Sequence, residues 1–318
     1  MKQNIYKTID VKDINGDSLQ SSILRTLAYF DIFNYPLNLD EICEYSDYNG
    51  ANPEQVLPEL NHLENEGIIK NSGSFYFMGN YSCVEKRLQA NHYSEKLMQK
   101  ALKYARIISY FPFVKSISIS GSLSKNNADA NADVDYFIIT KQNRLWICRT
   151  LLAVYKRIFL LNSSKYFCIN YFVDTANLEI HEKNIYTATE IAFLIPVFHY
   201  ENFFRFLDSN SWVNSYYPKK RIEITENMKS ADDSLFKKSI EFLLDNRFGN
   251  MVDDLCLSLN IFYRRLKFRR LNNHEWNENL RSTKGVSKHH PNSYQMRILK
   301  KYEEKLAIIK ESAGFELI

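Results

Sequence analysis

Two aspartates one residue apart carry the chemistry that this sequence suggests first. Asp133 and Asp135 open the run DVDYFIIT, which is typical of a strand. Because strand side chains alternate between faces, the two carboxylates are expected on one face, with Val134 in the opposite layer. Two carboxylates a few ångströms apart repel each other unless a cation lies between them, and oxygen ligands favour a hard divalent ion. The pair therefore predicts a site for Mg²⁺ or Mn²⁺.

A glycine and a serine precede this pair by ten residues. Gly121 and Ser122 directly follow the apolar run SISIS, which is also typical of a strand. The chain has only 9 glycines, so one at a strand end indicates a need for backbone freedom. A turn of this kind can offer backbone N–H groups and a hydroxyl to a phosphate. The competing interpretation is a surface hairpin whose aspartates are solvated.

Three cations near the pair are candidates for binding phosphate oxygens. Lys125 lies in the loop between the two predicted strands, and Arg144 and Arg149 lie in the helical segment 141–161 that follows. A helix that starts beside the carboxylates would bring the two guanidinium groups near a triphosphate. The alternative is that both arginines only cover a helix surface.

The order of these residues resembles the signature of the DNA polymerase β-type nucleotidyltransferase superfamily. The resemblance consists of Gly121-Ser122, ten intervening residues, and Asp133-Val134-Asp135 followed by apolar residues, and it covers residues 115–175. It implies transfer of a nucleoside monophosphate from an NTP to an acceptor hydroxyl, by means of metal ions held on three carboxylates.

The third carboxylate is where this sequence departs from the superfamily. The next predicted strand, 166–173, carries Asn170 at the position where the superfamily has an acid. A neutral amide is a weaker metal ligand and cannot act as a general base. Asp174 or Glu179 would replace it if the register differs. Without a replacement, the site would bind NTP and metal but transfer slowly or not at all.

The segment before this region resembles a winged helix. Residues 1–17 form a polar tail, and 18–80 contain three predicted helices and then a hairpin around Ser72-Gly73. The third helix, 53–67, has four glutamates and neither lysine nor arginine. Because carboxylates repel phosphates, we expect this module to dock a protein or orient a substrate rather than read DNA.

The remaining boundaries follow from the helical patterns. We expect an α/β (α+β) fold with a small mixed sheet in a catalytic domain at 81–215, and a helical C-terminal region at 216–318 whose apolar stripes are core. The run 264–270 has five cations in seven residues. It is either a solvated helix face or a contact for a polyanion.

Composition places the chain among ordinary globular proteins. The formal net charge is +4, with 45% hydrophobic and 25% charged residues. No stretch approaches the roughly 20 apolar residues of a membrane span, and the first residues lack a signal-peptide pattern. We expect a cytoplasmic protein. Five widely spaced cysteines predict neither disulfides nor a zinc site.

The function expected from these patterns is that of a Mg²⁺-dependent nucleotidyltransferase. Its acceptor would be a small molecule, a protein or an RNA. The alternative is a catalytically degenerate nucleotide-binding regulator that acts through the winged-helix-like module. A third hypothesis is an α/β protein that binds no nucleotide.

Overall fold

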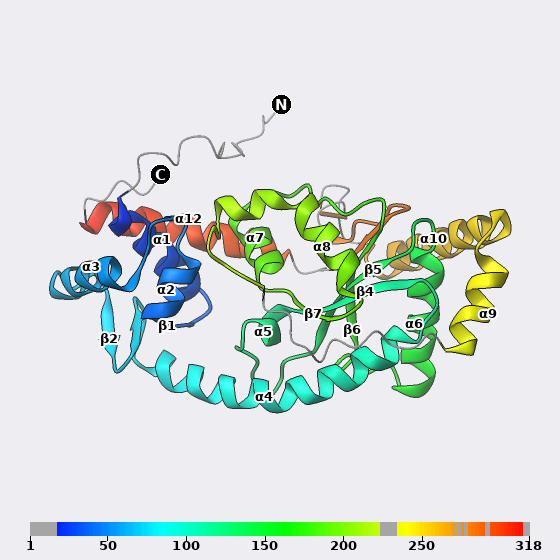
Figure 1. Ribbon diagram of the computed structural model, residues 1–318, viewed down its shortest axis with the longest axis horizontal. Coiled ribbons are helices and arrows are strands. Elements are labelled where there is room, and N and C mark those ends of the chain that lie inside the picture. Colours follow the sequence, from blue (N-terminus) through cyan, green and yellow to red (C-terminus); the bar gives the residue numbers. More distant parts are fainter. Residues whose placement is uncertain are drawn as a thin grey trace. The chain divides into compact units, whose positions relative to one another are not determined.

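The computed structural model describes residues 18–222, 234–269, 271, 275–276, 279–289 and 293–313 (Figure 1). It combines helices with two β-sheets. The described residues form two compact units, the first made of 18–87, 212–220 and 298–313 and the second of the rest. The predicted tail 1–17 lies outside the described residues. None of the described helices is long and apolar enough to cross a lipid bilayer.

The first unit has three helices followed by a hairpin, which is the predicted order. Its elements are α1 (Leu19–Asp31), β1 (Leu37–Asn38), α2 (Leu39–Tyr45), α3 (Pro53–Asn65), β2 (Lys70–Ser72) and β3 (Phe75–Phe77). The strands form an antiparallel sheet of order β1-β3-β2, in which β1 is an addition to the prediction. The Asn52 side chain caps α3 by accepting from the Gln55 N–H at 3.0 Å.

The outer surface of α3 is acidic. Val56, Leu60 and Leu63 are fully buried on its inner side. Glu54 and Glu64 are exposed, and the helix contains neither lysine nor arginine. Phosphates would be repelled by this face, so α3 lacks the basic surface with which recognition helices contact DNA.

The second unit is built on a mixed five-stranded sheet of order β7-β4-β5-β6-β8. Its strands are β4 (Val114–Ser120), β5 (Asp135–Thr140), β6 (Cys168–Asp174), β7 (Ile195–Phe198) and β8 (Val286–Lys288). The pair β5/β6 is parallel and the other pairs are antiparallel. The helices are α5 (Gly121–Ser124), α6 (Leu145–Phe159), α7 (Ile185–Ala192), α8 (Tyr200–Ser209), α9 (Leu235–Leu244) and α10 (Arg247–Lys267), with parts of α4 (Ser82–Ser109) and α12 (Tyr294–Ala313).

Different helices cover the two faces of this sheet (Figure 1). On one face Tyr136 is fully buried, and its hydroxyl donates to the Ala101 carbonyl of α4 at 2.9 Å. On the other face Phe137 contacts Phe206 of α8, with ring centroids 4.8 Å apart. Alternation along β5 therefore puts Asp135 on the Phe137 side, away from the core under α4 and α6.

The C-terminal part of the chain differs from the predicted helical region 216–318. Residues Val286–Lys288 form β8, which pairs antiparallel with β6 and completes the sheet. Three residues are too few to show a periodic pattern, so the sequence did not reveal this strand. Residues 212–220 and 298–313 belong to the first unit, so the predicted boundary at 215 does not separate the two units.

The predicted position of the helix after β5 is also corrected. That helix was expected to start beside the carboxylates. Strand β5 runs from Asp135 to Thr140, and α6 begins at Leu145, beyond the far end of the strand. Five residues of strand span about 17 Å. The N-terminus of α6 is therefore at the opposite end of the sheet from Asp135.

The apolar stripe of α10 that the sequence predicted as core is exposed, although Val252 and Leu257 of the same helix do pack against the core. Leu255, Leu259 and Phe262 are exposed, whereas Arg264 is buried and donates to the Ser282 hydroxyl at 2.7 Å. Periodicity defines a helical face but does not say which face meets the rest of the protein. The run 264–270 is thus neither a uniform solvated face nor a uniform basic surface, and its Arg270 lies outside the described residues.

Candidate functional site

The turn at Gly121 and the carboxylate of Asp135 are in direct contact. The pairing of β4 with β5 puts Ser120 opposite Asp135, and the chain then turns into the short α5. Gly121 has φ +71°, and a Cβ atom at this position would lie 2.6 Å from Asp135 Oδ2. Glycine is therefore needed both for the left-handed backbone and for the space that the carboxylate fills. Ser122 follows, half-buried, and its carbonyl accepts from the Asn127 N–H at 2.9 Å.

Asp135 is a carboxylate held in a poorly solvated place. Burial is the main cause that raises its pKa to about 6, and the negative charges of Glu190 and Asp133 raise it further. A hydrogen bond with Cys168 and the charge of Lys125 lower it. Near neutral pH the group is mostly ionised, but at a free-energy cost that a bound cation would offset.

Asp133 is exposed to solvent and lies close enough to Asp135 for its charge to raise the pKa of that carboxyl. Between them Val134 is fully buried, and its N–H donates to the Lys165 carbonyl at 2.9 Å. Burial therefore changes from exposed at Asp133 to buried at Val134 and half-buried at Asp135, as alternation along an extended segment would give. One carboxylate faces the solvent and the other is at the base of the site.

Asn170 reaches the carboxylate from the neighbouring strand. Tyr136 pairs with Ile169 and Phe137 with Tyr171, so Asn170 is the extra residue of a bulge in β6. Its Nδ2 donates to Asp135 Oδ1 at 2.9 Å. The predicted residue is thus at the site, where its amide serves as a hydrogen-bond donor to the carboxylate.

Neither suggested replacement for the third carboxylate lies at this site. Asp174 pairs with Thr140 at the far end of β5, where it is buried and accepts from the N–H groups of Asn143 (3.2 Å) and Ala176 (3.0 Å). Through these hydrogen bonds Asp174 fixes the loops that follow β5 and β6. Glu179 is exposed and pairs with Lys183 at 2.9 Å. Both are therefore structural or surface residues.

Glu190 of α7 is the acid that the sequence interpretation missed. Its Oε1 lies 3.0 Å from Lys125 Nζ, and its charge raises the pKa of Asp135. Lys125 Nζ also donates to the Gly121 carbonyl at 3.1 Å, so it joins the turn after β4 to α7. A sequence signal existed, since Glu190 is the only charged residue between Ile185 and Phe198.

Arg144 and Arg149 form their hydrogen bonds away from the two aspartates. Arg144 is buried and donates to the Asn246 carbonyl at 2.9 Å, at the start of α10. Arg149 donates to the Ile169 carbonyl at 3.1 Å, and burial lowers its pKa well below the usual value. Of the three predicted phosphate partners, the structure brings only Lys125 to the carboxylates.

The donor set suits a hard divalent cation. Asp133 and Asp135 supply carboxylate oxygens, and Glu190 adds a third acid beside them. The part of the chain that the structure describes contains no group of three or more Asp, Glu, His or Cys side chains already gathered around one point. The two aspartates are therefore the residues that would hold the ion, with Glu190 paired to Lys125.

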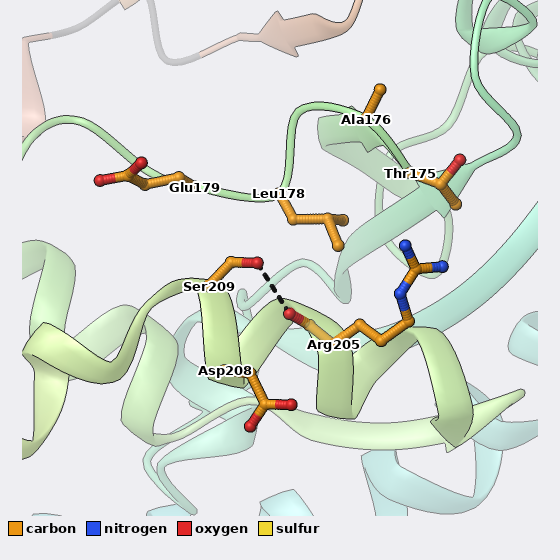
Figure 2. A pocket seen from close by; sticks show the side chains of 7 residues that line it. All are labelled: Thr175, Ala176, Leu178, Glu179, Arg205, Asp208 and Ser209. Atoms are coloured by element: carbon orange, nitrogen blue, oxygen red, sulfur yellow. Dashed lines mark hydrogen bonds between the residues drawn. The ribbon is translucent and has the colours of Figure 1, made fainter.

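A surface hollow, whose lining residues are drawn in Figure 2, lies at the other end of the sheet. It has a volume of about 520 Å³ and is lined by Thr175, Ala176, Leu178, Glu179, Arg205, Asp208 and Ser209. Thr175 N–H donates to the Thr140 carbonyl, which fixes the hollow next to the C-terminal end of β5. It is thus separated from Asp135 by the length of that strand, and we do not assign it to the carboxylate site.

Comparisons of this chain with protein-family models, with curated proteins and with solved structures find no match. A functional assignment therefore depends on the geometry just described. That geometry comprises a buried and an exposed aspartate, a glycine turn against one of them, and a lysine–glutamate pair beside them.

Substitution of the site glycine gives a controlled test of the contact with Asp135. We expect Gly121→Ala to weaken Mg²⁺ binding at least 10-fold, because the added methyl group displaces the Asp135 carboxylate. Gly67→Ala is the matched control, since Gly67 has the same φ of +71° and no atom within 4 Å of its Cβ position. Both variants incur about 1 kcal/mol of backbone strain. Mg²⁺ titration by calorimetry would contradict the assignment if the two variants bind alike.

Proposed function

We propose that the protein is a Mg²⁺-dependent nucleotidyltransferase, which moves a nucleoside monophosphate from an NTP to an acceptor hydroxyl and releases pyrophosphate. The observation that carries the proposal is the contact between Gly121 and Asp135 across β4 and β5, with Asp133 near enough for its charge to act on Asp135. A glycine turn and two carboxylates at adjacent strand ends can bind a triphosphate together with its metal ion. The resemblance in the order of these residues supports the same conclusion.

In this proposal each residue of the carboxylate site has a specific role. Asp133 and Asp135 would hold Mg²⁺, which supplies charge neutralisation and orientation of the phosphates when bound. The turn at Gly121 and the Ser122 hydroxyl would contact the phosphates, and Lys125 would add positive charge there. Asn170 holds the Asp135 carboxylate in position through its hydrogen bond.

Transfer itself requires an acceptor oxygen, a leaving group and a destination for one proton. The acceptor hydroxyl attacks the α-phosphorus, the bond from that phosphorus to the bridging oxygen breaks, and pyrophosphate leaves. The hydroxyl proton must pass to a nearby base. We propose Glu190 for this role, because it is the acid next to Asp135 that is not needed to hold the metal.

Binding of NTP tests the proposal directly. Isothermal titration of each NTP with Mg²⁺ into the wild type is expected to show metal-dependent binding of at least one. The Asp133→Ala/Asp135→Ala variant should bind at least about 100-fold more weakly, because both metal ligands are lost. Asp129→Ala is the matched control, an exposed aspartate of the same loop. Equal affinity in the double variant, or no binding by folded wild type, would refute the proposal.

The second candidate function is a nucleotide-binding regulator without transferase activity. The amide of Asn170 beside Asp135, in place of a third strand carboxylate, favours it. In that case the first unit would pass the signal to a partner. Its acidic α3 makes a protein partner a better match than DNA.

Release of pyrophosphate by the wild type separates the two candidates, and Glu190→Gln tests the proposed base. If Glu190 accepts the proton, the variant should bind Mg²⁺–NTP within a few-fold of wild type but transfer about 10²- to 10⁴-fold more slowly. The readout is release of pyrophosphate, measured against the affinity from calorimetry. Glu179→Gln, an exposed glutamate at the far end of the sheet, is the control. An unchanged transfer rate would remove Glu190 from the mechanism.

A further inference from the structure

The outer face of α10 is apolar and exposed. Its residues Phe248, Met251, Leu255, Leu259, Phe262 and Leu266 are between 43% and 70% exposed. They follow one another at spacings of three or four residues, which puts all six on one side of the helix. We refer to these six residues as the α10 stripe. The neighbouring α9 adds Phe242 (89% exposed) and Leu243 (64%).

The inner face of the same helix combines buried polar residues with partly buried apolar ones, among them Val252 and Leu257, which pack against the core. Asp253 is fully buried and accepts from the Ile147 N–H of α6 at 2.9 Å. Arg264 is also buried, and donates to the hydroxyls of Ser282 (2.7 Å) and Ser287 (3.1 Å). An ordinary surface helix has a polar outer face, so a helix that is apolar on its outer face as well differs from this pattern. The α10 stripe is therefore suited to contact another surface.

The exposed area is as large as a stable protein interface. A fully covered aromatic side chain buries roughly 150–250 Å², and a leucine or methionine side chain lies at or below the lower end of that range. The eight side chains on α9 and α10, each about half to nine-tenths exposed, thus present on the order of 1,000 Å². The largest apolar patch of a typical monomer is about 300–600 Å², and a stable complex buries about 800 Å² on each partner. One such face on each of two molecules is sufficient for a dimer.

A hollow next to the α10 stripe adds to this surface. A hollow of about 170 Å³ lies beside the stripe between α6 and α10, lined by Thr150, Cys256, Leu259, Asn260 and Tyr263. A cavity of about 150 Å³ accepts a benzene ring, so this hollow can take one phenyl group. Phe262 projects from the same stripe. An exposed apolar face of this kind can pair with a second copy of itself about a two-fold axis.

Charges on one edge of the stripe favour an antiparallel arrangement. Asp254 and Arg265 are 11 residues apart, which is close to three turns, so they lie on the same side of α10. Their midpoint falls between Leu259 and Asn260. A two-fold axis there would put Asp254 of one copy opposite Arg265 of the other. Asp254 already pairs with Lys284 but is 63% exposed, and Arg265 is also exposed.

We propose that the protein is a homodimer whose two-fold interface is formed by the α10 stripe and the outer face of α9, with the α10 helices antiparallel. Burial of the stripe supplies most of the affinity, and the Asp254–Arg265 pairs fix the register. The interface uses none of the residues assigned to the carboxylate site. The proposal therefore stands independently of the proposed function.

Sedimentation velocity of the full chain tests the dimer. We expect a species of about 75 kDa, twice the 37.5 kDa of one chain, at micromolar concentration. Leu255→Glu/Leu259→Glu should give the monomer. Leu88→Glu is the matched control, since Leu88 of α4 is 54% exposed, and it should remain dimeric. A wild type that is monomeric at tens of micromolar, or a double variant that stays dimeric, would overturn the proposal.

Cysteine cross-linking and charge reversal test the interface without relying on a variant that could fail to fold, and they define the register of the two helices. Leu259→Cys should form a disulfide-linked dimer on mild oxidation, because a residue beside the two-fold axis meets its own copy. Leu88→Cys should not. Asp254→Arg alone and Arg265→Asp alone should each weaken the dimer about 3- to 10-fold, and their combination should restore it. A combination as weak as the single variants would overturn the antiparallel register.

Discussion

Replacing Asp135 by Asn is expected to abolish Mg²⁺-dependent nucleotide binding and, at pH 8, to make the protein more stable. The pKa of Asp135 is raised, chiefly by burial, from 3.8 to about 6. A folded-state pKa above the unfolded value means that the folded protein holds this proton more tightly. The contribution of this group to the free energy of unfolding is therefore fully present below about pH 4 and is lost as the pH rises through 4 to 6. Two pKa units correspond to about 3 kcal/mol.

Asparagine retains the shape of this side chain without the charge. Its amide oxygen can still accept from Asn170 Nδ2, so the hydrogen bond of 2.9 Å can be kept. We therefore expect the free energy of unfolding of Asp135→Asn to lack the decline between pH 4 and 6, and to exceed that of wild type by up to about 3 kcal/mol at pH 8. Mg²⁺ should raise the Tm of wild type at pH 8 but not that of the variant.

Urea unfolding at pH 4 and pH 8 measures both parts of this prediction. Asp129→Asn provides the control, because that aspartate is exposed and its removal should change neither the pH dependence nor the Mg²⁺ effect. Equal stability of wild type and Asp135→Asn at pH 8 would show that the carboxylate is well solvated. A gain in stability without loss of Mg²⁺ binding would instead remove Asp135 from the metal site.

What the sequence predicted correctly depends on neighbours along the chain. The alternation of Asp133, Val134 and Asp135 follows from strand geometry alone, and a glycine after a strand indicates a turn that needs positive φ. The helices of the first unit have caps and apolar stripes within a few residues of each other. These features are local, so a single sequence contains enough information to place them.

The sequence could not predict in which direction a strand carries the chain, or which residues distant in sequence come together. Arg144 follows β5 closely in sequence, but the strand carries the chain away from the carboxylates before α6 begins. Glu190 is 55 residues beyond Asp135, and only the path through β6 and α7 brings it back to Lys125. In the same way, the pattern of α10 defined an apolar face. Only the pairing of Asp253 with α6 shows that this face points outward.

The path of the chain between α9 and α10 depends on a second glycine, and its replacement gives the largest loss of stability that we expect. A Cβ atom at Gly249 would lie 1.7 Å from the backbone carbonyl oxygen of Leu244 and 3.2 Å from Arg144 Cζ. Neither the carbonyl nor the buried guanidinium can move freely, since Arg144 is bonded to the Asn246 carbonyl at 2.9 Å. Gly249→Ala must therefore open the turn.

We expect Gly249→Ala to lower the free energy of unfolding by about 3 kcal/mol or more and the Tm by about 10 °C. Gly50→Ala is the control, because the nearest atom to its Cβ position is Tyr48 Cε1 at 2.8 Å, on an exposed side chain that can move aside. It should lose about 1 kcal/mol or less. Differential scanning calorimetry measures the Tm of both variants, and similar Tm values would contradict the prediction.

Because the turn orients α10, Gly249→Ala should also weaken the dimer, while Mg²⁺ binding below the Tm should persist.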